Sequence, residues 1–226
     1  MRLTHLGHSC LLLEDGGGRL LIDPGSMSPG AEELTDLDAV LITHAHSDHL
    51  DAERLPVLLD GNTTAELITE PEVAVELTRV GIEARGLHPG EATAVAGFEV
   101  LALGGLHAPV HPEAPRIGNI GLLLRGPGGA AVYHPGDAVD ALPPPGSGPV
   151  DVLALPVSGS WLSIGMAIDF ARAVAPRAVL AVHDAALSPY GRRSAGYWLT
   201  HLLGMPVLDG AEPIDVEAVA ATSSPR

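Results

Sequence analysis

The feature that most constrains this chain is a run of six residues that contains four side chains able to bind a metal ion. The four are His44, His46, Asp48 and His49. They follow the apolar segment 39–43, which is rich in β-branched residues and predicts a buried strand. The four side chains should therefore lie at the carboxyl end of a strand, the edge of an α/β sheet where binding and catalytic groups collect.

The spacing of these side chains allows one loop to serve two metal ions. His44 and His46 can turn both imidazoles toward one cation, while Asp48 and His49 point toward a second. Neutral imidazole and carboxylate suit zinc, manganese or iron, and the lack of thiolate argues against a structural four-cysteine zinc site. The alternative is a polar loop whose histidines merely face water, which four ligands within six residues disfavour.

The run has the form His-x-His-x-Asp-His, and in this the sequence resembles the metallo-β-lactamase superfamily of metallohydrolases. That family has three further ligands, a histidine, a bridging aspartate and a last histidine, each after a strand. His107, Asp137 and His183 each follow an apolar run here. The resemblance implies two metal sites that share Asp137, with these further ligands: His44, His46 and His107 in one, and Asp48, His49 and His183 in the other.

Within the superfamily, the sequence looks most like the UlaG-like branch. The matching segments are Leu6-Gly7-His8-Ser9, 20–24, 133–137 and 182–184. The chain departs from the lactamases that use a cysteine ligand, because its single cysteine, Cys10, sits in an apolar strand far from the ligand run. Antibiotic hydrolysis is therefore not the expected activity.

The resemblance implies an α/β fold of four layers, an αβ/βα sandwich of two mixed sheets flanked by helices, with the metal centre at one edge. We expect residues 1–226 to form a single domain, since the segment 141–149, although dense in proline and glycine, is short and has ligands on both sides. The implied mechanism is hydrolysis by a hydroxide held between two metals about 3.5 to 4 Å apart, where the pKa of water falls to about 7.

Hydrophobic periods and turn signals predict the elements along the chain. A loop or short helix is expected at 27–35, and a frayed tail from 218 to 226. Strands are expected at 3–6, 10–14, 19–23, 39–43, 65–69, 92–96, 98–103, 119–125, 130–133, 150–156, 178–182 and 206–208, and helices at 50–59, 71–80, 163–174 and 192–203.

Composition excludes several classes of function. All twelve basic residues are arginine, so a lysine Schiff base or a lysine acid or base is excluded. The net charge of −16 and the aromatic content of 3% argue against a nucleic-acid partner and favour a small-molecule substrate. Two divalent metals would offset up to about four charges locally, so an anionic small substrate stays open.

The sequence has one cysteine, and it shows neither a signal-peptide pattern nor a long apolar run. These features predict a cytoplasmic protein without a membrane segment. A homo-oligomer is left open.

Two of the ligands and several other residues are candidates for catalysis or for support of the metals. The residues expected to act in catalysis are Asp48, Asp137, His111 and His134. His111 lies in a proline-rich loop, 106–116, that should form a substrate-facing wall. Either His111 or His134 would protonate the leaving group. The alternative for His111 is a solvated loop, and the alternative for His134 is a residue that simply ends a strand. Arg116 in that loop could pair with a carboxylate or phosphate.

Supporting residues are also expected around the histidine loop. The resemblance suggests that Asp23 accepts a hydrogen bond that orients this loop, since ligating histidines usually need such a partner; the alternative is a turn residue before Pro24. His8 is placed in the same role. Trp161 should either line the pocket or lie in the core.

Four functions compete on the sequence alone. Hydrolysis of a small ester, lactone or amide is favoured, and a phosphodiesterase would use the same metals. The third is a di-iron redox centre, which in this superfamily usually goes with a flavin domain for which this chain has no room. The fourth is a metal-binding protein without turnover.

Overall fold

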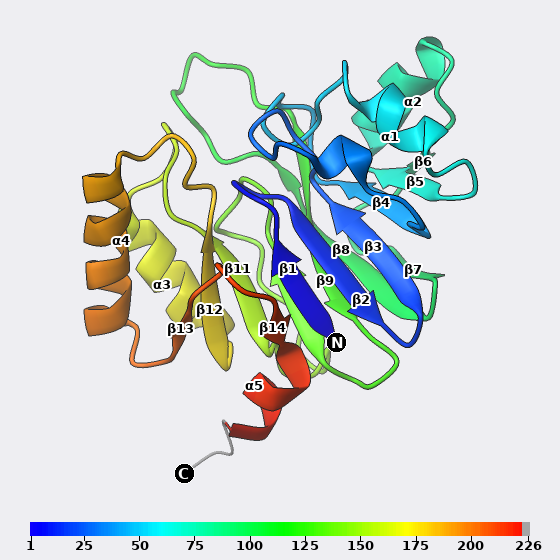
Figure 1. The fold of residues 1–226 in the computed structure, drawn as a ribbon. Helices are drawn as coiled ribbons and strands as arrows, with labels where there is room; N and C mark the ends of the chain where they lie inside the picture. Colours follow the sequence, from blue (N-terminus) through cyan, green and yellow to red (C-terminus); the bar gives the residue numbers. More distant parts are fainter. Residues whose placement is uncertain (223–226) are drawn as a thin grey trace.

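The computed structural model describes residues 1–222, and over these residues the chain forms two seven-stranded sheets packed face to face. Helices lie on both outer faces (Figure 1), so the layers follow the order helix, sheet, sheet, helix. This confirms the αβ/βα sandwich that the resemblance implied.

The first sheet has the strand order β14-β1-β2-β3-β4-β5-β6. The strands from β1 to β3 form an antiparallel meander, whereas those from β3 to β6 run parallel, so the sheet is mixed. Its strands are β1 (Arg2–His5), β2 (Leu11–Asp15), β3 (Gly18–Ile22), β4 (Ala39–Ile42), β5 (Glu66–Thr69), β6 (Arg85–Gly86) and β14 (Ile214–Asp215).

The second sheet has the order β13-β12-β11-β10-β9-β8-β7 and is also mixed. The strands from β7 to β10 are antiparallel, and those from β10 to β13 are parallel. Its strands are β7 (Ala92–Val95), β8 (Phe98–Leu106), β9 (Gly118–Arg125), β10 (Ala131–His134), β11 (Val152–Pro156), β12 (Ala178–Val182) and β13 (Val207–Leu208).

Helices α1 and α2 cover the first sheet, and α3 and α4 cover the second (Figure 1). The helices are η1 (Ala31–Glu33, a 3-10 turn), α1 (Leu55–Asp60), α2 (Pro71–Arg79), α3 (Ile164–Val174), α4 (Pro189–Leu202) and α5 (Val216–Thr222). Within residues 1–222, no helix is both long and apolar enough to cross a bilayer.

Burial on both faces explains why the strand before the ligand run is apolar without alternation. In β4, Ala39 and Leu41 pack into the core between the sheets, whereas Val40 and Ile42 pack under the helices of the first sheet. Strands covered on both faces read as continuous apolar runs. The residues of β11 alternate in the same way between the core and the helices of the second sheet. The carboxyl ends of β4 and β11 are therefore held rigidly at one edge of the sandwich.

The structure differs from the expected elements mainly at their ends. The helix expected at 50–59 begins only at Leu55, because residues 50–54 form a turn in which Asp51 Oδ1 accepts hydrogen bonds from the backbone N–H groups of Glu53 and Arg54. Helix α4 begins earlier than expected, where the Ser188 hydroxyl accepts a hydrogen bond from the N–H of Gly191.

The C-terminal tail also differs from expectation. Helix α5 occupies 216–222, where fraying was expected from residue 218, and residues 223–226 lie outside the described part of the chain. The short strands β6 and β14, of two residues each, were not expected at all.

Candidate metal centre

The seven side chains expected to bind metal lie together at one edge of the sandwich, and both sheets contribute. The ligand run follows β4 of the first sheet, while His107, Asp137 and His183 follow β8, β10 and β12 of the second. Together with His8, these side chains fall into two groups of four, each with its ligand atoms within 4.8 Å of one another. The centre therefore forms where the carboxyl ends of strands from the two sheets meet.

The first group comprises His44, His46, His107 and Asp137. The ring nitrogens His44 Nε2 and His46 Nδ1 are 3.1 Å apart, and His107 Nε2 lies 3.3 Å from Asp137 Oδ2. A zinc ion binds imidazole nitrogen at about 2.0 to 2.1 Å, so one cation can reach both histidines of the loop.

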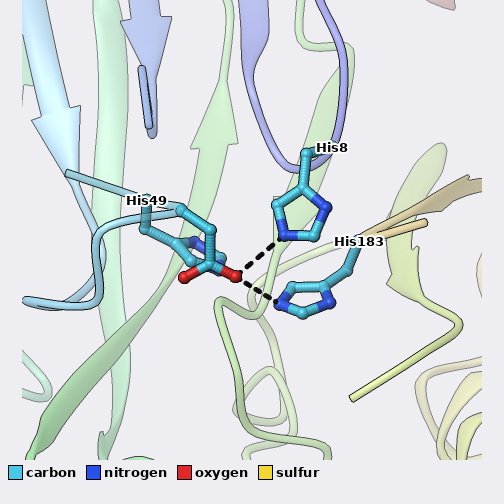
Figure 2. Close-up of side chains that lie close together, drawn as sticks. His8, His49 and His183 are labelled. Carbon is cyan, nitrogen blue, oxygen red and sulfur yellow. Dashed lines mark hydrogen bonds and ion pairs between the residues drawn. The ribbon is translucent and has the colours of Figure 1, made fainter. Parts of the chain in front are cut away.

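The second group comprises His8, Asp48, His49 and His183. The rings of His8 and His183 point to the same carboxylate oxygen (Figure 2), which is Asp48 Oδ2, at 3.0 and 3.4 Å. The resemblance named three members of this group. His8 was expected only in a supporting position, and the signal for it was its segment, 6–9, which lies between β1 and β2.

Asp137 lies between the two groups. Its Oδ1 is 3.1 Å from His49 Nε2, and its Oδ2 is 3.2 Å from His183 Nε2 and 3.3 Å from His107 Nε2. The carboxylate thus contacts ligands of both groups, which is the position that a bridging ligand requires.

Hydrogen bonds behind the histidines leave the inward nitrogen free. Asp23 Oδ2 accepts one from His49 Nδ1 at 2.7 Å and another from the Thr43 hydroxyl at 2.7 Å. Because that hydroxyl donates to Asp23, its oxygen accepts from His44 Nδ1 at 3.0 Å. In His107, Nδ1 donates to the carbonyl of the following residue. Each bond fixes the tautomer that presents Nε2 as a ligand, which confirms the role expected of Asp23.

Several buried atoms of the centre have no hydrogen-bond partner. They include His49 Nε2 and Asp137 Oδ1. A buried polar atom without a partner costs about 1 to 3 kcal/mol, and coordination of a cation removes that cost. The residues present therefore fit divalent metal ions, and their nitrogen and carboxylate donors suit zinc, manganese or iron.

Charges in the centre are strongly coupled. Burial opposes ionisation of Asp137, but neighbouring His49 and hydrogen bonds from His107 and His183 hold its pKa well below the usual range. Burial lowers the pKa of His183, yet hydrogen bonds to Asp137 and Asp48 raise it to about 9. In a metal-free sample His183 is protonated at neutral pH, so metal binding must displace that proton.

Trp161 lies against the metal ligands. It is buried, and its indole Nε1 donates a hydrogen bond to Asp137 Oδ2 at 3.1 Å. The ring meets His107 and His183 edge-on, with centroids 5.7 and 6.0 Å away. Its burial favours the core position over the pocket wall, and its contact with the Asp137 carboxylate was not expected.

His134 lies away from any open surface. It is 1% exposed, its Nε2 donates to the carbonyl of Ser9 at 2.9 Å, and its Nδ1 accepts the N–H of Gly136 at 3.1 Å. Burial also lowers its pKa. This arrangement favours the alternative, a structural strand-end residue, over the expected role as proton donor to a leaving group.

The loop expected to face the substrate is exposed. His111 Nδ1 accepts the backbone N–H of Glu113, and its role as a proton donor stays a prediction. Arg116 donates from Nε to the carbonyl of His107 at 2.7 Å and lines an open depression of about 320 Å³ together with Leu106 and Asp140. A larger cavity, of about 630 Å³, lies at α1, β5 and β6 and is lined by none of the metal-binding side chains. The candidate site is therefore identified by the chemistry of its side chains and not by the size of a cavity.

Comparisons with known proteins agree with this geometry. Residues 2–183 match the model of the β-lactamase superfamily domain. Protein Rv0786c of Mycobacterium tuberculosis is 47% identical over 193 residues, covering 85% of this chain and 88% of that protein. A UPF0173 metal-dependent hydrolase of Archaeoglobus fulgidus is 30% identical over 197 residues, covering 81% and 83%. Igni18, a metallo hydrolase of Ignicoccus hospitalis, has a similar fold, with a TM-score of 0.69, 22% identity and coverage of 94% and 97%.

Proposed function

Because the chain belongs to the metallo-β-lactamase superfamily and is a metal-dependent hydrolase, we propose that it cleaves a small ester, lactone or amide with the help of two divalent metal ions. The observation that carries this proposal is the position of Asp137, whose two oxygens contact ligands of both groups. A single-metal site would need no such shared carboxylate.

The proposed ligands are the side chains of the two groups other than His8. When bound, two such metals lower the pKa of a shared water to about 7 and polarise the oxygen of the scissile bond. Zinc is the preferred ion, with manganese or iron as alternatives that the same donors accept. One metal would be held by His44, His46 and His107, the other by Asp48, His49 and His183, with Asp137 between them.

The exposure of the ligands indicates where a substrate would approach. His46 is exposed and Asp48 half-buried, whereas His44 and His49 are fully buried. The open side of the centre is therefore the side of the ligand loop. Asp48 and Asp137, held by hydrogen bonds from neighbouring rings, would fix the geometry of the attacking water at this opening.

The charge distribution supports an uncharged carbonyl substrate over a phosphodiester. The chain carries a net charge of −16 and has no lysine. Arg116, the arginine of the expected substrate-facing loop, directs its Nε to the backbone carbonyl of His107. A phosphodiester would need cationic groups beyond the metals to offset this acidic surface.

The test combines metal analysis with a panel of substrates. We would measure the metal content of the purified protein and its turnover of a lactone, a p-nitrophenyl ester and bis-p-nitrophenyl phosphate. Asp137→Ala is the test variant, and Asp169→Ala, an exposed side chain on α3, is the matched control. We expect two metals per chain and loss of about 100-fold or more in turnover for Asp137→Ala only.

The other outcomes separate the alternatives. A protein without metal, or turnover indifferent to Asp137→Ala, would overturn the two-metal mechanism. Turnover of the phosphodiester alone would make the chain a phosphodiesterase. Two metals with no turnover of any class would favour a metal-binding protein.

A further inference from the structure

We infer that His8 is a positioning residue that builds the second metal site, because it holds Asp48 from one sheet and the loop of His183 from the other. The inference rests on the proposed two-metal centre and assigns to His8 a role in one of its two sites. Four separate contacts support it.

The side chain of His8 is oriented by hydrogen bonds at both ring nitrogens. Its Nδ1 accepts the backbone N–H of Ala185 at 3.3 Å, so this nitrogen carries no proton. The proton of the neutral ring is therefore on Nε2, which lies 3.0 Å from Asp48 Oδ2 and donates to it. In this tautomer His8 acts as a donor to a metal ligand.

The backbone of His8 fixes a second ligand. Its carbonyl accepts the N–H of His183 at 2.8 Å, and the two rings lie with centroids 4.0 Å apart. His183 has a φ of +57°, in the left-handed region that residues other than glycine rarely adopt. Contacts from His8 on both its backbone and its ring hold His183 in this conformation.

The local backbone places His8 where it can make these contacts. Gly7 has a φ of +105°, and a Cβ there would lie 3.2 Å from the carbonyl oxygen of Met27. His8 itself has a φ of +50° and is 1% exposed, so its ring turns inward rather than to solvent. The turn between β1 and β2 thus buries a polar ring away from bulk water.

The ligands that His8 contacts all belong to the second group. They are Asp48, His183 and, at a ring-centroid distance of 5.9 Å, His49. Loss of the His8 ring should therefore weaken binding of one metal and spare the other. If His8 were instead a fourth ligand of this metal, its loss would weaken the same site. The variants must therefore distinguish a hydrogen-bond donor from a metal ligand.

The experiment is a zinc titration of the metal-free full-length protein against a chromophoric chelator, which resolves the first and second equivalents. For His8→Ala, we expect the second equivalent to bind about 10 to 100-fold more weakly and the first to change less than about twofold. His8→Gln keeps an N–H near the position of Nε2, so we expect it to restore most of the affinity. His201→Ala, an exposed histidine on α4, should bind zinc as the unchanged protein does.

Each contrary result has its own meaning. An unchanged second equivalent in His8→Ala, or an equal loss of both equivalents, would overturn the inference. If His8→Gln binds as weakly as His8→Ala, His8 is a ligand and not a donor. If His8→Ala does not fold, His8→Asn replaces it, since its shorter amide cannot reach Asp48. Binding of a single equivalent by the unchanged protein would instead overturn the two-metal proposal on which the inference rests.

Discussion

The carboxylate oxygen Asp23 Oδ2 lies 2.7 Å from His49 Nδ1, and both groups are fully buried. The same oxygen accepts from Thr43, which in turn accepts from His44. One carboxylate therefore sets the tautomer of two ligands that belong to different metal groups.

Replacement of Asp23 by asparagine should weaken both metal sites. The amide keeps a single acceptor oxygen. With that oxygen in place of Oδ1, His49 and the Thr43 hydroxyl lose their acceptor; with it in place of Oδ2, the amide N–H group opposes the backbone N–H of Thr43, which Oδ1 accepts at 2.8 Å. Either arrangement disturbs the loop that carries ligands of both groups. We expect metal affinity to fall about 10 to 100-fold in Asp23→Asn, measured by chelator competition. Asp36→Asn is the control, since Asp36 is exposed and asparagine tolerates its φ of +59°. Unaltered affinity in Asp23→Asn would contradict this role.

Trp161→Phe should affect the Asp137 carboxylate while an aromatic ring still fills the space of the indole. Phenylalanine keeps an aromatic ring against His107 and His183 but cannot donate to Asp137 Oδ2. A hydrogen bond to a charged group contributes about 1.5 to 3 kcal/mol, so we expect a loss of about tenfold or more in kcat/KM or metal affinity. Trp198→Phe, on the exposed face of α4, should change neither quantity. Equal behaviour of the two variants would mean that the indole N–H does not matter.

His134→Phe separates a structural role from a catalytic one. The variant leaves the carbonyl of Ser9 and the N–H of Gly136 without a partner. We expect the free energy of unfolding to fall by about 1 to 3 kcal/mol in urea, with kcat changed less than about twofold. A loss of kcat of about 100-fold in protein that remains folded would restore the role of proton donor.

His111→Ala tests the remaining candidate for proton donation. If this exposed side chain protonates the leaving group, its loss should cost about 100-fold with a poor alkoxide leaving group and little with p-nitrophenolate, which needs no proton. The comparison of an alkyl ester with a p-nitrophenyl ester gives this ratio directly. His88→Ala, an exposed turn histidine, is the control. An equal effect on both esters would exclude general acid catalysis by His111.

The stability of the metal-free protein should depend on pH through His183. Its pKa is raised to about 9 in the folded chain, because hydrogen bonds to Asp137 and Asp48 outweigh burial, whereas the unfolded value is about 6.5. Its protonated form thus contributes stability that is complete below about pH 6.5 and is lost as the pH rises through about 9. Urea unfolding across this range should reveal the loss.

The metal-loaded protein and the variant His183→Gln are the controls for this titration. A bound metal requires the neutral ring, and glutamine does not titrate, so neither sample should lose stability over the same interval for this reason. A metal-free protein that keeps constant stability between about pH 6.5 and 9 would show that His183 is not protonated there.

The sequence could place the candidate ligands together because each follows an apolar strand, and strand ends at one edge of a sheet meet in space. His44, His107 and Asp137 could therefore be placed together although the chain separates them widely. The role of Asp23 was accessible for the same reason, since it closes β3 beside β4.

Other features were inaccessible because they depend on side-chain conformation or on distant pairing. The contact of His8 with Ala185 spans 177 residues, and no local pattern predicts it. The direction of the Trp161 indole depends on a rotamer, and whether His134 faces substrate or backbone depends on what packs against it. Strands of two residues such as β6 are too short to show a period, and their pairing alone defines them.

Both sheets supply side chains to each group: two and two in the first group, three (with His8) and one in the second. Metals bound there would tie one half of the sandwich to the other, and the chain's single cysteine cannot form an internal disulfide to do so. The centre would thus act as a cross-link as well as a catalyst, and separation of the sheets would require release of the ions. For such a protein the availability of metal would determine how long the chain stays folded as well as how fast it converts substrate.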